Sequence, residues 1–123
     1  MNVYDKLNDL TRAISESPDF IKYKAAAEII DKNATYSEMV KDFMRAQFEI
    51  SASKMLGQEP TDDVIQNFNN LYSSMAGISV INDFLQAQAA FNIILNDVTK
   101  EITKATTVDV DFLKILPDFT GFS

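Results

Sequence analysis

Cysteine and histidine are both missing from this chain of 123 residues. Without cysteine, the chain has no disulfide bonds, no thiolate ligands for zinc or iron–sulfur clusters and no cysteine nucleophile. Without histidine, it lacks the commonest general base and the commonest transition-metal ligand. Carboxylates, lysines, tyrosines and hydroxyls would have to carry any reaction. We therefore expect a non-enzymatic protein with no catalytic residue, no metal site and no cofactor.

Long apolar runs are missing as well. No stretch approaches the ~20 residues that cross a bilayer. Met1 to Asp9 mixes polar residues with isolated apolar ones, unlike the apolar segment of a secretory signal. These features predict a cytoplasmic protein with no membrane partner.

Basic residues are absent from the middle of the chain. The net charge is −7, and Gly57 to Thr99 contains no lysine or arginine. The charged residues of this stretch are Glu59, Asp62, Asp63, Asp83 and Asp97. Nucleic-acid binding needs clustered cations that displace the counterions of the phosphates. We therefore expect no direct contact with nucleic acid.

Apolar residues spaced by three and four positions predict an all-α fold of about five helices, arranged as a long helical hairpin or bundle. The length suits one domain, which we place at residues 1–105. The expected helices span residues 3–15, a segment that begins at Pro18, a segment from Asn33 or Thr35 to about Leu56, a segment that begins near Thr61 or Asp62, and a segment from about Ser79 to about Lys104.

Capping residues support these boundaries. Ser17 before Pro18 is typical of a helix start, and Thr35 with Glu38 fits a capping box. Gly57 is expected to end the third helix, because glycine adopts the left-handed conformation without strain. Ser79 is the expected cap of the last helix.

The tail at residues 106–123 has a different pattern. Val108, Val110 and Phe112 alternate with aspartates as in a strand, and further large apolar residues follow. A solvated tail would carry fewer of them. We expect this extended apolar tail to pack on the helices or on a neighbouring subunit.

Two helical seams, each interrupted by one glutamine, are the strongest pattern. The first consists of Tyr36, Val40, Phe43, Gln47 and Ile50, and the second of Ile81, Phe84, Gln88, Phe91, Leu95, Val98 and Ile102. Such spacing keeps one stripe of a helix facing a partner helix. The glutamines either hydrogen-bond across helices and set the register, or lie at the seam edge and reach water.

The second seam is the candidate interface between subunits, because it lies mostly in the cation-free, aromatic-rich stretch. The predicted interface residues are Ile81, Phe84, Leu85, Gln88, Phe91, Leu95, Val98 and Ile102. The alternative is a central helix that is buried inside one monomer. The first seam lies among balanced charges and is predicted to pack within the subunit.

Two smaller patterns have simple structural readings. Met39, Met44 and Met55 are expected to fill the core, although methionines also suit adaptable protein-binding surfaces. Asp62 and Asp63 complement the positive end of a helix dipole, which explains them better than a metal site does.

Several short motifs make the chain similar to the YlbF/YmcA family of small helical bacterial proteins, in particular its YheA-like branch. They are Val3-Tyr4-Asp5-Lys6, Ser17-Pro18 with Phe20 and Tyr23-Lys24, Phe43 with Gln47, Gly57-Gln58, and Ala87-Gln88 before Phe91, and together they cover roughly residues 1–105. The resemblance implies an all-helical protein without enzymatic activity that forms dimers or larger assemblies. It also implies a regulatory role like that of relatives that influence RNA processing by ribonuclease Y, competence, sporulation and biofilm formation.

Some relatives bind iron–sulfur clusters through cysteines, a property that cannot apply to a chain without cysteine. The function expected from the sequence is therefore a helical adaptor or regulatory protein. Its partners would be other copies of itself, as a homodimer or higher oligomer, and other regulatory proteins. The alternative is a helical bundle that binds or converts a small molecule through carboxylates and tyrosines such as Tyr72.

Overall fold

The computed structural model describes residues 2–114, which contain five α-helices, one short 3-10 helix and no strand. The helices are α1 (Val3–Ser15), α2 (Pro18–Asp31), α3 (Ala34–Met55), α4 (Asp62–Ala76) and α5 (Ser79–Thr106), followed by η1 (Asp111–Leu113). The predicted all-α class and the number of helices are confirmed.

Side-chain caps begin three of the helices after the first. The Ser17 hydroxyl accepts a hydrogen bond from the Phe20 N–H at 3.3 Å. The Thr61 hydroxyl accepts one from the Val64 N–H at 3.3 Å, and the Asn33 side chain accepts one from the Tyr36 N–H at 3.0 Å. Each bond satisfies a backbone donor that the first turn of a helix leaves without a partner. Asn33, the first of the two predicted starts, is therefore the cap of α3, and the predicted capping box of Thr35 and Glu38 does not form.

The start of α5 differs from the prediction. Its cap position is Ile78, with no side-chain hydrogen bond, and Ser79 is already the first helical residue. A different polar side chain closes the α4–α5 turn: Nδ2 of Asn82 donates to the carbonyl oxygen of Ala76 at 2.6 Å. The prediction of a cap at Ser79 is therefore wrong, because the hydrogen bond that secures this turn comes from a residue one turn further along α5.

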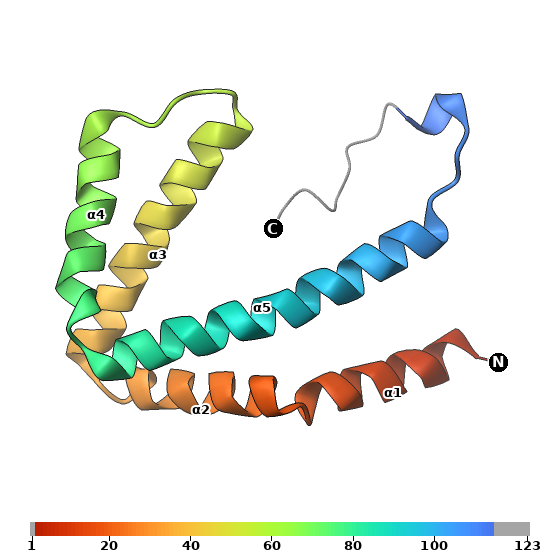
Figure 1. Cartoon of the computed structure of the whole chain (residues 1–123), viewed down its shortest axis with the longest axis horizontal. Coiled ribbons are helices and arrows are strands. Elements are labelled where there is room, and N and C mark those ends of the chain that lie inside the picture. Colours follow the sequence, from red (N-terminus) through yellow and green to blue (C-terminus); the bar gives the residue numbers. More distant parts are fainter. Residues whose placement is uncertain (1, 115–123) are drawn as a thin grey trace.

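The helices form two arms that meet at one end (Figure 1). One arm is the antiparallel hairpin of α3 and α4, whose tip is the loop that begins at Gly57. There the backbone has the left-handed φ of 73°, as expected for the glycine that ends α3. In the other arm α2 and α5 run antiparallel, and α1 continues beyond α2 (Figure 1).

The core lies where the two arms meet. Its buried side chains are Ile30, Val40, Phe43, Met75, Ile81 and Phe84, which come from α2, α3, α4 and α5. No polar or charged residue in the described part of the chain is buried. Burial of apolar surface at this junction therefore holds the arms together.

No single helix within residues 2–114 is long and apolar enough to span a membrane. Helices α4 and α5 meet the length and composition requirement only when they are joined across a bend of 114°.

The described part of the tail leaves the helices without forming a strand. Val108 and Phe112 are exposed, and Leu113 in the 3-10 helix is half-buried. The strand-like alternation of residues 108–112 is thus not realised in this chain, where no second strand accompanies it in residues 2–114. The remainder of the predicted tail, residues 115–123, lies outside the described residues.

Candidate interaction surfaces

The predicted interface on α5 divides into two parts. Ile81, Phe84 and Phe91 are buried within the chain, and Leu85 and Gln88 are half-buried. Beyond Phe91 the seam opens: Leu95 is 39% exposed and Ile102 is 54% exposed, with Val98 half-buried between them. The first part therefore belongs to the core of one chain, and only the second part is free to meet another molecule.

Aromatic rings from α2 explain this division. Phe20 lies against Phe91 with ring centroids 5.1 Å apart, and Tyr23 stacks on both Phe84 and Phe91 at 5.7 and 5.5 Å. Such pairs add to the stabilisation that burial provides. Because α2 begins at Pro18, only its first two residues lie beyond Phe20 in the direction of the C-terminal half of α5.

Helix α1 carries a second uncovered apolar stripe. Val3, Leu7 and Leu10 are exposed and Ile14 is half-buried, at the spacing that puts them on one side of a helix. No residue of α1 is buried, and its substantial contact is with its neighbour α2. The predicted bounds of this helix, residues 3–15, match the structure, and its apolar stripe is a candidate surface that the sequence prediction does not include. The spacing of these apolar residues can be read from the sequence. That no other helix covers them can be seen only in the structure.

The first seam packs between α3 and its neighbours. Val40 and Phe43 are buried, and Tyr36 and Ile50 are half-buried. The Phe43 ring lies 5.0 Å from the Phe68 ring of α4. These positions suit the predicted role of this seam within the subunit.

The two glutamines occupy different environments. Gln47 is exposed, so at this position the interpretation of a seam-edge residue that reaches water applies. Gln88 is half-buried. Among residues 2–114 neither side chain makes a hydrogen bond to another residue, so within one chain neither sets a register.

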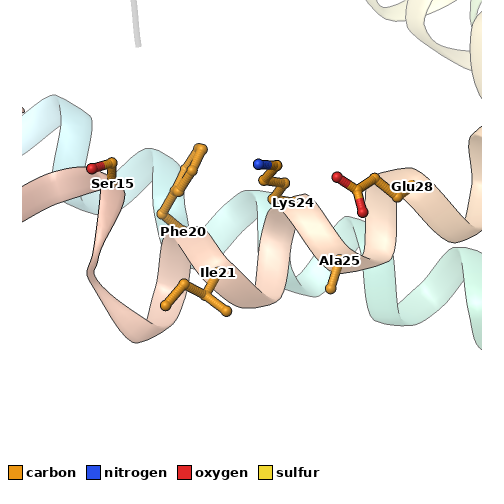
Figure 2. Close-up of a pocket in the computed structure, with 6 residues that line it drawn as sticks. All are labelled: Ser15, Phe20, Ile21, Lys24, Ala25 and Glu28. Atoms are coloured by element: carbon orange, nitrogen blue, oxygen red, sulfur yellow. The ribbon is translucent and has the colours of Figure 1, made fainter. Parts of the chain in front are cut away.

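One surface hollow along α2 lacks converging polar groups. Its volume is about 420 Å³, and it is lined by Ser15, Phe20, Ile21, Lys24, Ala25 and Glu28. All six come from the end of α1 and from α2. Phe20 and Lys24 point to one side of α2, while Ile21 and Ala25 point to the other (Figure 2). This arrangement offers no enclosed site where several polar groups could hold a small molecule.

Groups for the alternative enzymatic function do not converge either. Tyr72 is half exposed on α4 and lies beside Phe43, with ring centroids 6.2 Å apart. Within residues 2–114 no group of three or more acidic side chains is arranged to hold a metal ion. The site-forming features of the described chain are therefore apolar surfaces.

The sequence matches the family model described as "Control of competence regulator ComK, YlbF/YmcA" over residues 3–107. The chain belongs to the YlbF/YmcA family. This match runs from the first residue of α1 to just past the end of α5. It confirms the resemblance seen in the sequence motifs.

Several proteins named UPF0342 are similar to this YlbF/YmcA chain over almost its whole length. The one from Caldicellulosiruptor saccharolyticus is 31% identical over 94% of this chain and 96% of the relative. The one from Symbiobacterium thermophilum is 32% identical over 91% and 100%. The one from Limosilactobacillus reuteri is 27% identical over 98% and 97%.

Proposed function

We propose that this protein is a non-enzymatic, cytoplasmic regulator that acts by associating with itself and with other proteins. The family description refers to control of the competence regulator ComK. From it we carry over the general class, a regulator that works through protein contacts. The exposed apolar stripes of α1 and of the C-terminal half of α5 support this class over a catalytic one.

The observation that carries the proposal is the large exposed surface of the single chain. The chain exposes 9509 Å². A compact monomer of 13.8 kDa would expose about 6,600 Å². Residues outside 2–114 do not account for the difference, because ten residues add at most about 1,600 Å² even when fully extended. Even after that amount is subtracted, the remaining excess of exposed surface is larger than the ~800 Å² that each partner buries in a typical stable interface.

The surface proposed for self-association combines α1 with the C-terminal half of α5. Phe91 faces α2, and the three- and four-residue steps to Leu95, Val98 and Ile102 keep the stripe on that side of α5. Beyond α2 this side is left to α1, which diverges from α5 in Figure 1. Two uncovered apolar stripes therefore lie near the same end of the molecule.

A second copy offers the complementary surface. Two copies related by a twofold axis would present the same pair of stripes to each other, and α1 and α5 of both would form a four-helix bundle. The tail that follows α5 belongs to the same proposal, because Val108 and Phe112 are exposed just after the helix ends.

Molar mass in solution tests the proposal. By sedimentation equilibrium at micromolar concentrations, the wild-type chain should have the mass of a dimer or larger assembly. Leu95→Glu combined with Ile102→Glu should reduce this to the monomer mass with helix content retained. Ile93→Glu is the matched control, because Ile93 is 62% exposed on the opposite side of α5. A wild-type protein that stays monomeric at tens of micromolar would refute the proposal.

A further inference from the structure

The hairpin of α3 and α4 has one polar side. A hollow of about 260 Å³ on this side is lined by Asp42, Arg45, Ala46 and Glu49 from α3 and by Asn67 and Leu71 from α4. Residues from both helices line this one hollow. The side of α3 that carries Asp42 and the side of α4 that carries Asn67 therefore lie on the same face of the hairpin.

The other side of the hairpin is apolar. Helical spacing puts Met44, Phe48 and Met55 on one side of α3, turned well away from Asp42. The same spacing puts Ile65 and Tyr72 on one side of α4, turned well away from Asn67. The polar hollow lies on one face of the hairpin, and on each helix the apolar residues are turned away from that hollow. These five residues therefore lie together on the other face of the hairpin. We call them the hairpin patch.

The hairpin patch is exposed despite its large apolar side chains. Phe48 is 74% exposed and Met55 is 69% exposed. The patch adjoins the apolar core, since the Tyr72 ring lies 6.2 Å from the ring of the buried core residue Phe43. Methionine and aromatic residues with few charges among them are typical of the centre of a protein-binding surface. The patch lies on the arm opposite to the proposed self-association surface, so it needs a different explanation.

Acidic groups dominate the charge of the hairpin. Within residues 34–76, all of which the structure describes, the acidic side chains are Glu38, Asp42, Glu49, Glu59, Asp62 and Asp63, and the basic ones are Lys41, Arg45 and Lys54. Lys41 pairs with Glu38 at 3.2 Å, and Arg45 pairs with Asp42 at 3.2 Å. The remaining four acids and Lys54 lie from the middle of α3 to the start of α4, so the tip half of the hairpin is net negative.

We propose that the hairpin patch binds an amphipathic helix with a basic polar face from another protein. Apolar residues of that helix would cover Phe48, Met55 and Ile65, which are exposed on α3 and α4. Its lysines and arginines would lie near the acids of the hairpin tip, where complementary charge increases the association rate and selects the partner. This inference is independent of self-association, because it uses the other arm.

A labelled model peptide tests the charge complementarity directly. The probe is a synthetic peptide of about 18 residues with leucines at helical spacing on one face and lysines and arginines on the other. Its counterpart carries glutamates at the basic positions. By fluorescence anisotropy at low salt, the basic peptide should bind at least about tenfold more tightly than the acidic one, and added salt should narrow the difference.

Variants of the full chain locate the binding site. Phe48→Ser combined with Met55→Ser should weaken binding of the basic peptide about tenfold or more. Glu59→Gln with Asp62→Asn and Asp63→Asn should reduce the preference for the basic peptide. Ile21→Ser is the matched control, since it removes an exposed isoleucine from α2 and should leave binding unchanged. Circular dichroism checks that every variant remains folded.

Three outcomes would overturn the inference. The first is equal affinity of the basic and acidic peptides for the wild-type chain. The second is unchanged peptide binding by the folded Phe48→Ser/Met55→Ser variant. The third is a fall in the molar mass of that variant, which would identify a second copy as the occupant of the patch. The variant with Leu95→Glu and Ile102→Glu should still bind the basic peptide, so failure of the self-association proposal would be seen separately.

Discussion

The ring of Tyr23 on α2 stacks on the ring of Phe91 on α5, with centroids 5.5 Å apart and an interplanar angle of 17°. Phe91 is the last buried residue of the second seam within the part of the chain that the structure describes. Before it, α5 packs inside the chain. After it, Leu95 and Ile102 are exposed on the same stripe. This stacked pair therefore marks the point where one seam changes from core to free surface.

Phe91→Ala should lower the free energy of unfolding by about 3 kcal/mol, because it removes a buried ring and leaves a cavity beside Phe20 and Tyr23. Chemical denaturation at a fixed protein concentration measures the change. Ile93→Ala, at an exposed position two residues away, should change it by less than about 0.5 kcal/mol. Equal effects of the two substitutions would show that α5 does not pack on α2 as described.

Protection of α1 from hydrogen exchange should depend on self-association. A helix of 13 residues without a buried face is marginal alone in water, so the proposed self-association would stabilise α1. Amides of residues 3–15 should exchange slowly in the wild-type assembly and at least about tenfold faster in the Leu95→Glu/Ile102→Glu variant. Amides of α3 provide the internal control and should change little. Equal exchange of α1 in both proteins would contradict its place in the interface.

Thr61→Ala should destabilise the chain by about 1 kcal/mol, because the Thr61 hydroxyl caps α4 through the Val64 N–H. Ser79→Ala is the comparison. Ser79 is the first residue of α5 and no side chain caps that helix, so its substitution should cost less than about 0.5 kcal/mol. Thermal unfolding followed by circular dichroism measures both. A larger cost at Ser79 than at Thr61 would reverse the assignment of the caps.

Two glycine substitutions should have opposite effects. Gly57 has a φ of 73°, so Gly57→Ala should destabilise the chain by roughly 1 kcal/mol or more, because alanine is strained in this left-handed conformation. Gly77 has a φ of −86°, and a Cβ built there would meet no atom within 4 Å. Gly77→Ala should therefore be neutral or stabilise the chain by up to about 1 kcal/mol through the unfolded state. Denaturant midpoints measure the pair, and a destabilising Gly77→Ala would count against the described turn.

Local chemistry explains which features were predictable. Ser17 and Thr61 begin helices because their hydroxyls reach backbone donors only three residues away, and such bonds are encoded locally. Ser79 misled the prediction because the hydrogen bond at that turn comes from Asn82, six residues beyond its acceptor Ala76. Met44 and Met55, expected in the core, are exposed, because both lie on the face of α3 that carries the hairpin patch.

The sequence by itself determined the all-α class, the approximate helix bounds and the two apolar seams, because caps and helical spacing act over a few residues. Only the tertiary structure decided which part of each stripe is covered. Identical spacing runs from Ile81 to Ile102, yet α2 buries the first half and leaves the second half exposed. Burial depends on which helix lies opposite, and that is set by how the two arms meet, which no local pattern records.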